Sequence, residues 1–268
     1  DIFGTLSPQS KMKRAFVSWI DRMCIRMSKK IIVLSEWSKE RLHRLGGVHA
    51  SNILVLPSGT DIKHFKPENK KDSCRQIGLD PELFYIGFVG SFFDYQGVDT
   101  LIRAAPIILS ETGRLKFLLV GDGPMMDSWK NSVVADGLQD HFIFTGQVPY
   151  KSVPLYISAM DMCVAPHTKI SNQSSPVKIF DYMSCARPII ASNLGVVREI
   201  IKNSGCALLV PPGEARSLAQ NAIRLIADEQ LRNEMGKNGR EFACHNYDRS
   251  KISNDFIKMV FKLRSETS

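Results

Sequence analysis

From residue 85 onward, short apolar runs alternate with amphipathic stretches, one pair about every twenty to thirty residues. The apolar runs predict buried strands at 85–90, 116–121, 142–145, 162–166, 188–192 and 207–210. The stretches between them predict helices near 97–111, 125–137, 150–160, 175–186 and 195–203, and further helices follow at 214–227, 229–243 and 248–264. This alternation is typical of an α/β fold with a doubly wound parallel sheet and right-handed crossovers.

The first part of the chain shows a shorter version of the same pattern. It predicts a helix at 11–30, a strand at 31–35, a helix at 36–45 and a strand at 52–57. Residues 62–83 are polar and rich in lysine and proline, which indicates a linker with a short helix.

Open sheets of this kind bind ligands beyond the carboxyl ends of their strands, so the residues just after each strand are the candidates for a site. After the first strand, Gly90 and Gly97 bracket a loop whose backbone can approach a phosphate closely, although a plain tight turn gives the same pattern. After the second strand, Gly121 begins G-D-G-P. A dinucleotide fingerprint requires a third glycine at 126, where this chain has methionine, which disfavours a nicotinamide dehydrogenase.

The stretch 172–192 carries the densest signal. Ser174 or Ser175 suits a helix N-cap and Pro176 the first helical position. We expect a core-facing stripe of Val177, Phe180 and Cys185. Lys178 and Asp181 fall outside this stripe, one turn apart near the positive end of the helix. These features suit an anionic ligand, but a capped surface helix with a solvated ion pair remains an alternative. His167, just after the fourth strand, is the one histidine near this region, and it suits either a ligand contact or a structural role.

The motifs that follow the strands resemble, in order, those of GT-B glycosyltransferases, most closely the retaining enzymes of family 4, from about residue 30 to 248. The motifs that carry the resemblance are S-P-V-K-I-F-D-Y-M at 175–183, the segment 182–192, G-D-G-P at 121–124, T-G-Q-V-P at 145–149, the turn 193–199 and P-P-G-E at 211–214. The chain departs from the family where Gln173 stands for an acid, and where Ser91 and Gln96 stand for a cationic clamp.

The resemblance implies roles for individual residues in binding a nucleotide-diphosphate sugar. Asp181 would accept hydrogen bonds from the ribose, and Gln173 would contact the transferred sugar. The diphosphate would lie against the first two loops and the helix N-terminus, with Lys178 or Lys169 supplying a positive charge. The residues implied in donor binding, beyond Gln173 and Lys178 as the catalytic pair, are Gly90, Ser91, Gln96, Gly121, Gln147, Val148, His167, Ser174, Ser175, Asp181 and Glu199.

The resemblance also implies an organisation. Residues 1–60 would be a truncated remnant of an acceptor-binding, Rossmann-like domain and 61–84 a linker. Residues 85–247 would form the Rossmann-like donor-binding domain, and 248–268 a helix that crosses back. The chain begins with Asp1 rather than methionine, so we expect a fragment that is not fully active by itself.

The implied reaction transfers a sugar to a glycan, lipid or small-molecule acceptor with retention of anomeric configuration. It requires no metal and no cofactor, and the sequence contains no metal-ligand spacing. Two alternatives remain: a nucleotide-sugar-binding module without catalysis, and a fragment that docks on a membrane or a partner protein.

Charge and composition bear on the second alternative. The net charge is +8, and residues 11–50 contain ten Lys and Arg residues against three acids. The same segment carries an apolar stripe of Phe16, Trp19, Ile20, Met23 and Met27. Residues 11–44 therefore suit contact with an anionic membrane, or a helix packed on a sheet with solvated charges. Nucleic acid is disfavoured because no recognition module is present. Six scattered cysteines indicate reduced thiols, so we expect a cytoplasmic protein, at most peripheral at the inner face of the membrane.

Overall fold

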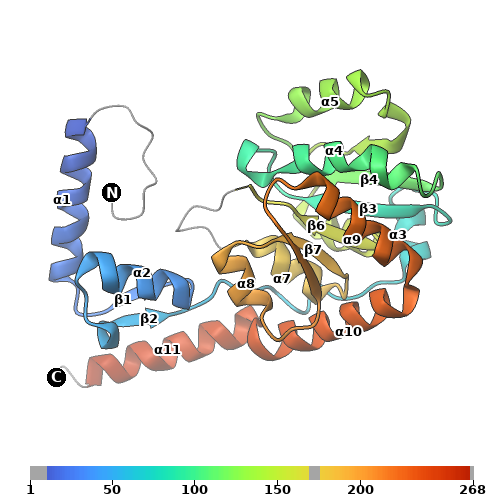
Figure 1. Ribbon diagram of the computed structural model, residues 1–268. Helices are drawn as coiled ribbons and strands as arrows, with labels where there is room; N and C mark the ends of the chain where they lie inside the picture. Colours follow the sequence, from blue (N-terminus) through green and yellow to red (C-terminus); the bar gives the residue numbers. More distant parts are fainter. Residues whose placement is uncertain (1–10, 169–175, 266–268) are drawn as a thin grey trace. The chain divides into compact units, whose positions relative to one another are not determined.

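The computed structural model describes residues 11–168 and 176–265 (Figure 1). Among these residues the chain divides into two compact units, one formed by 11–58 and 250–265 and a larger one formed by 59–168 and 176–249. Each unit is described by itself below.

The larger unit is built on a six-stranded sheet with strand order β5-β4-β3-β6-β7-β8. All neighbouring strands pair in parallel, which confirms the predicted doubly wound sheet. The strands are β3 (Phe84–Val89), β4 (Leu115–Val120), β5 (Phe142–Phe144), β6 (Met162–Ala165), β7 (Ile189–Ser192) and β8 (Ala207–Val210). The chain starts at β3, moves outward to β5 and then returns to β6 on the other side of β3. The boundary between β3 and β6 is therefore the topological switch point.

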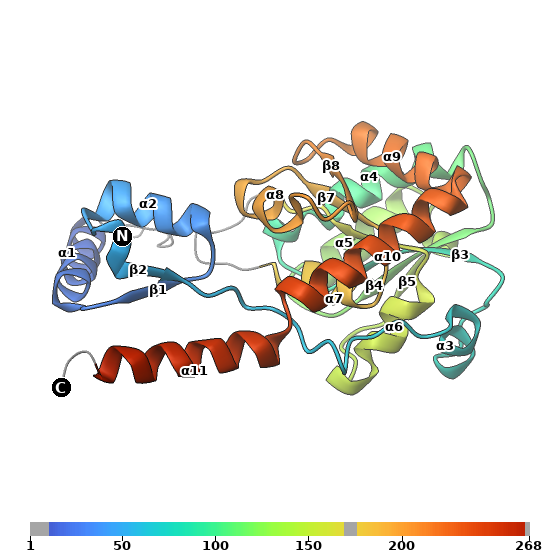
Figure 2. The same ribbon diagram turned by 90° about the horizontal axis from the view of Figure 1, so that it is seen from below.

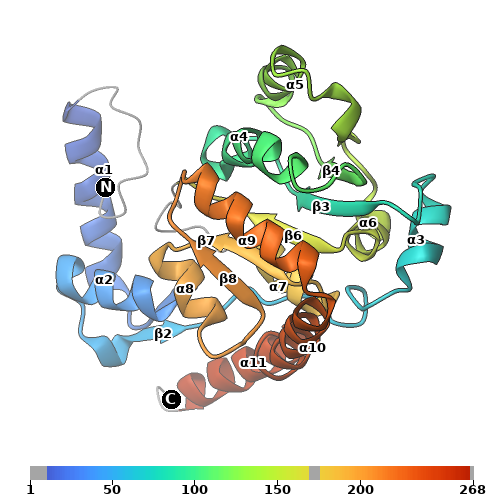
Figure 3. The same cartoon turned by 45° about the vertical axis from the view of Figure 1, so that its right-hand side comes forward.

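Helices cover both faces of this sheet (Figures 2 and 3). α4 (Val98–Leu109), α5 (Met126–Ala135) and α9 (Ala215–Ala227) share one hydrophobic core with alternate residues of the strands, such as Ile86, Phe88 and Phe117. α7 (Val177–Ser184) packs against α10 (Glu229–Asn246), and α3 (Lys70–Gln76) packs against α6 (Val153–Ala159). α8 (Gly195–Ile201) lies between β7 and β8. The strands are buried on both faces because both faces carry helices.

The expected core-facing stripe on α7 is wrong at one position. Val177 is 38% exposed, whereas Phe180 and Cys185 are fully buried as expected, together with Ile179 and Met183. The helix begins at Val177, so this residue lies at the open end of the first turn. Residues one turn further along are the ones that face the sheet and α10.

The segment predicted to be a linker, 61–84, packs onto the larger unit. Phe65 is 1% exposed and Cys74 is fully buried, and α3 lies within this segment. Lys70 fastens α3 to the start of β6, since its Nζ lies 2.8 and 2.9 Å from the two carboxylate oxygens of Asp161. Asp161 also accepts a hydrogen bond from the backbone N–H of Tyr85 at 2.8 Å.

The smaller unit contains α1 (Lys11–Met27), β1 (Ile31–Val33), α2 (Glu36–Gly46), β2 (Ile53–Val55) and most of α11 (Arg249–Ser265). β1 and β2 pair in parallel across α2 and share a small core of Val33, Leu42 and Ile53. Ser35 caps α2 by accepting a hydrogen bond from the N–H of Ser38 at 3.1 Å. Within the described ranges, no helix is both long and apolar enough to cross a membrane.

The cysteines divide by exposure. Cys74, Cys163, Cys185 and Cys206 are buried, and burial raises the pKa of each of these thiols. Cys24 on α1 is exposed and Cys244 on α10 is partly exposed. All six thiols are free, and the buried ones are therefore inert packing residues.

We expect Asp161→Ala to lower the free energy of unfolding by about 2–4 kcal/mol, because it removes the carboxylate that holds both the Lys70 ammonium and the Tyr85 N–H. The side chains of this pair are only 24% and 15% exposed. The control is Asp72→Ala, which breaks the exposed pair with Arg75 and should cost at most about 0.5 kcal/mol. Equal urea midpoints for the two variants would contradict the assignment of Asp161 as the anchor of α3.

Candidate functional site

A pocket of about 310 Å³ lies at the carboxyl ends of β3, β4 and β5. Its lining residues are Val89, Gly90, Ser91, Val120, Gly121, Asp122, Gln147, Val148 and Val153. Five of the residues predicted from the sequence come together here: Gly90, Ser91, Gly121, Gln147 and Val148. Val89, Val120, Asp122 and Val153 were not predicted as site residues. Asp122 lies within the G-D-G-P motif, and this position was the signal for it.

Backbone hydrogen bonds between the loops give the pocket its shape. The N–H of Gly90 donates to Val120 O at 3.0 Å, and the N–H of Gly121 donates to Gly146 O at 3.1 Å. The loop after β3 is tied to the next one where the N–H of Phe92 donates to Asp122 O at 2.8 Å. A Cβ at Gly121 would lie 2.0 Å from Gly90 O, so only glycine permits this approach. The three loops therefore form one hydrogen-bonded wall.

The loops after β3 and β6 also approach closely. A Cβ at Gly97 would lie 1.9 Å from Pro166 O, and Gly97 has φ of +71°. The N–H of Thr168 donates to Tyr95 O at 3.1 Å. The topological switch point is thus closed by direct backbone contact.

His167 lies buried next to this contact, with 4% of its surface exposed. Its Nδ1 is 3.3 Å from Ala165 O. Burial, and secondly the positive charge of Lys178, lower the pKa of His167 to about 3. The imidazole is therefore neutral at physiological pH, and any contact with a ligand is made by an uncharged ring.

Lys178 extends from α7 to the end of β3. Its Nζ donates to Gln96 Oε1 and lies 3.9 Å from the centroid of the Phe88 ring. A Cβ at Gly90 would lie 2.9 Å from this Nζ, so the ammonium adjoins the wall of the pocket. The N–H of Val89 donates to Tyr182 Oη at 2.7 Å, which fixes α7 against the same strand end. In the described part of the chain, no carboxylate forms an ion pair with Lys178, and burial lowers its pKa well below the ordinary value.

Asp181 lies one turn further along α7 and is half-buried. Its Oδ1 accepts a hydrogen bond of 2.6 Å from Thr60 Oγ1. Burial raises the pKa of Asp181 to about 6, while the Thr60 hydrogen bond and the charges of Arg249 and His64 oppose this rise. Asp181 does not line the 310 Å³ pocket. Thr60 was not among the predicted site residues.

The remaining predicted residues lie elsewhere. Glu199 is half-buried on α8, close enough to Tyr247 for its charge to raise the pKa of that phenol, after the larger effect of burial. It does not line the pocket. Lys169, Gln173, Ser174 and Ser175 lie outside the described residues.

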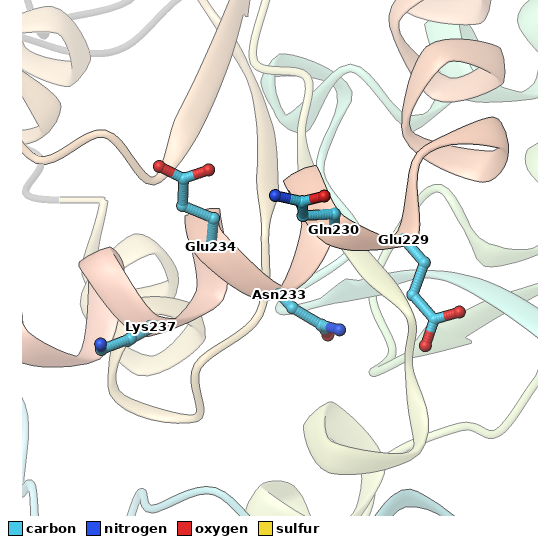
Figure 4. Close-up of a pocket in the computed structure, with 5 residues that line it drawn as sticks. All are labelled: Glu229, Gln230, Asn233, Glu234 and Lys237. Atoms are coloured by element: carbon cyan, nitrogen blue, oxygen red, sulfur yellow. The ribbon is translucent and has the colours of Figure 1, made fainter.

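Another hollow, of about 630 Å³, follows one face of α10 and is lined by Glu229, Gln230, Asn233, Glu234 and Lys237. Figure 4 shows these side chains pointing in different directions from a single helix. Across residues 11–168 and 176–265, no group of three or more His, Cys, Asp or Glu side chains is arranged to hold a metal ion.

The fold and the strand-end pocket define the chain as the Rossmann-like half of a GT-B glycosyltransferase. Residues 69–242 match the family described as glycosyl transferases group 1, and the chain belongs to this family.

Among curated relatives, the chain is 24% identical over 237 residues to alpha-D-kanosaminyltransferase of Streptomyces kanamyceticus, covering 87% of this chain and 60% of that protein. It is 25% identical to the UDP-Gal:alpha-D-GlcNAc-diphosphoundecaprenol alpha-1,3-galactosyltransferase of Escherichia coli, covering 98% and 66%. The chain thus spans about three fifths to two thirds of the length of these relatives.

Among solved structures, sucrose-phosphate synthase from Thermosynechococcus elongatus is similar with a TM-score of 0.83 and 25% identity, covering 98% of this chain and 64% of that one. The Anabaena protein HepE, solved in complex with UDP, is similar in fold with a TM-score of 0.81 and 21% identity, covering 96% and 70%.

We expect Gly97→Ala to destabilise the protein by about 3 kcal/mol or more, because the new Cβ would collide with Pro166 O. The matched control is Gly137→Ala, since Gly137 has a similar φ of +68° but no atom within 4 Å of the added Cβ. The control isolates the backbone strain, which is about 1 kcal/mol. Similar losses in guanidinium unfolding for both variants would contradict a steric closure of the switch point.

Proposed function

We propose that this chain supplies the donor-binding half of a retaining glycosyltransferase that uses a nucleotide-diphosphate sugar. The observation that carries the proposal is the pocket at the ends of β3, β4 and β5, with the Lys178 ammonium beside Gly90 at its wall. Membership in the glycosyl transferases group 1 family supports this reading. So does the binding of UDP by HepE, which shares the fold, and UDP is therefore the first nucleotide to test.

In this proposal, different loops hold different parts of the ligand. Backbone groups of Gly90, Ser91 and Gly121 are proposed to face the diphosphate, since glycines allow close approach of the chain. Gln147 and Val148, after β5, are proposed to hold the base through their backbone. Gln96 and His167 would act behind the diphosphate, since Gln96 accepts a hydrogen bond from Lys178 and the charge of Lys178 lowers the pKa of His167.

Lys178 is proposed to stabilise the charge that develops on the leaving diphosphate. Burial has removed water from this ammonium, and among the described residues no carboxylate pairs with it. Its interaction with a phosphate is therefore more favourable than that of a solvated ammonium. An anion that binds there also raises the pKa of Lys178, so that the charged form is present when the ligand is bound. In the same proposal Gln173, Ser174 and Ser175 approach the sugar and the diphosphate, and Glu199 completes the donor site.

Asp181 is proposed to accept hydrogen bonds from the ribose hydroxyls. This role requires the ionised carboxylate, whose oxygens only accept. Because burial raises its pKa to about 6, Asp181 is mostly ionised at neutral pH and is protonated as the pH falls below 6. Nucleotide binding is therefore strongest at neutral or higher pH.

The proposed reaction proceeds with retention, without a metal or cofactor, and its acceptor is a glycan, a lipid or a small molecule. The proposed organisation remains that of the sequence prediction, with acceptor contacts outside the larger unit. The replacement of the family's cationic clamp by Ser91 and Gln96 favours one alternative, a module that binds the donor without catalysis. Binding of the nucleotide without turnover by the complete protein would support that alternative.

A second candidate function is peripheral contact with an anionic membrane, proposed for the basic segment 11–44. The apolar stripe on α1 is exposed to solvent, with Phe16 at 61%, Trp19 at 57% and Met27 at 78%. Basic residues surround this stripe in the sequence. An exposed apolar stripe with lysines and arginines around it suits the interface of an anionic bilayer.

We expect calorimetry to detect UDP binding, and Lys178→Gln to weaken it about 10- to 100-fold, because a charge-assisted contact contributes about 1.5–3 kcal/mol. Binding of the nucleoside, which has no phosphate, should not change. The control is Lys130→Gln, an exposed lysine on α5 that makes the same change in net charge. If UDP, GDP and ADP all fail to bind the folded protein, the donor-site proposal is wrong.

We expect the protein to sediment with phosphatidylglycerol vesicles more than with phosphatidylcholine vesicles. A Phe16→Ser, Trp19→Ser double variant should bind at least about 10-fold more weakly, since it removes two large apolar side chains. The control is Val134→Ser, at a similarly exposed position on α5. Equal binding to both lipids, or no effect of the double variant, would refute membrane docking by α1.

A further inference from the structure

Thr60 is buried completely and bonded on every side. Its Oγ1 donates to Asp181 Oδ1 at 2.6 Å, across 121 positions of sequence. Its backbone N–H donates to Tyr247 O at 2.8 Å, and its carbonyl accepts from the N–H of Arg249 at 2.9 Å. The two backbone hydrogen bonds therefore fix the position of Thr60, and its side-chain bond to Asp181 fixes the direction of the hydroxyl.

The neighbourhood of Thr60 is equally fixed. Arg240 on α10 donates to Ile62 O at 3.1 Å and to Phe65 O at 2.9 Å, just after Thr60 in the chain. The same guanidinium donates to Ser184 O at the end of α7 at 2.9 Å. One arginine thus ties the segment that contains Thr60 to the helix that contains Asp181. The distance between the hydroxyl and the carboxylate is set from both sides.

We propose that Thr60 is a positioning residue for the donor site, which orients the Asp181 carboxylate so that one oxygen is held by the protein and the other is left for the ligand. The proposal rests on the proposed function of Asp181. In the described structure, Asp181 Oδ2 receives no hydrogen bond, so its lone pairs remain for the hydroxyls of a ribose. Thr60 itself does not touch the ligand, since its side chain points to Asp181.

The same hydrogen bond favours the ionised form of Asp181, because a hydroxyl donates to a carboxylate more strongly than to a carboxylic acid. The other charged or titratable groups that act on Asp181 are Arg249 and His64, which lower its pKa. On its own helix, Tyr182 and Cys185 both respond to its charge. Burial opposes the effects of Thr60, Arg249 and His64, and it raises the pKa of Asp181 to about 6.

The sign of the pH effect follows directly. Nucleotide binding needs the carboxylate, so affinity is lost as the pH falls through the pKa of Asp181. Removing the Thr60 hydroxyl deletes an interaction that lowers this pKa. The pKa must then rise, and the loss of affinity must begin at a higher pH.

The test compares Thr60→Val, which keeps the shape and removes the hydroxyl, with Thr60→Ser, which keeps the hydroxyl. UDP binding is measured by calorimetry from about pH 5 to pH 8.5. At the high-pH end, where Asp181 is ionised in both proteins, we expect Thr60→Val to weaken binding about three- to tenfold, which corresponds to the loss of one hydrogen bond. The midpoint of its pH profile should move upward, and Thr60→Ser should restore the wild-type midpoint. A merely structural role would lower affinity or stability without moving the midpoint.

The Thr60→Val comparison is repeated in two further variants, Asp181→Asn and His64→Gln. In Asp181→Asn, which has no carboxylate to titrate, Thr60→Val should have no further effect on the pH profile. Because the charge of His64 acts on Asp181, the profiles are repeated with His64→Gln. If Thr60→Val does not fold, Thr60→Ala is measured against the same criterion.

The possible failures are distinguishable. If the wild type binds no nucleotide, the proposed function itself is wrong. If the wild type binds UDP, but removal of the hydroxyl leaves the midpoint unchanged, the donor site stands and the role of Thr60 is overturned.

Discussion

The path of the chain through the parallel sheet is the constraint on which the site depends. The chain leads outward from β3 to β5 on one side and returns to β6 on the other. The loops that leave β3 and β6 therefore run in opposite directions from the switch point. Close backbone approach at Gly97 joins the loops after β3 and β6, and at Gly121 it joins the loops after β3 and β4. Neither position has room for a larger residue. The closure of the switch point and the shape of the pocket therefore both require glycine at these two positions.

Helix α7 carries two side chains of opposite charge type, Lys178 and Asp181, which bond to different parts of the larger unit. Lys178 reaches the end of β3 without a carboxylate partner, whereas Asp181 is held by an uncharged hydroxyl. Burial shifts both groups toward their neutral forms, the lysine downward and the aspartate upward. The two do not neutralise each other, although they lie one turn apart. A ligand with a phosphate and hydroxyl groups can therefore interact with both side chains, the phosphate with Lys178 and the hydroxyls with Asp181.

The sheet was predictable from the sequence because parallel strands buried on both faces appear as continuous apolar runs. The six predicted strands lie within one or two residues of β3 to β8, and five predicted strand-end residues meet in one pocket. Contacts between distant segments were not predictable. The Thr60 to Asp181 bond and the Lys178 to Gln96 bond join residues 121 and 82 positions apart, and neither leaves a local pattern. The segment 61–84 appeared as a linker because two buried side chains, Phe65 and Cys74, are hidden among lysines and prolines.

The distribution of thiols has a practical consequence. The four buried cysteines have raised pKa values and no access to solvent, so maleimide reagents should pass them over. The accessible pair, Cys24 and Cys244, falls in different units of the chain. The wild-type polypeptide therefore already carries one attachment point for a fluorophore in each unit. Energy transfer between two dyes at these positions would follow the separation of the units as nucleotide is added, without any engineered cysteine.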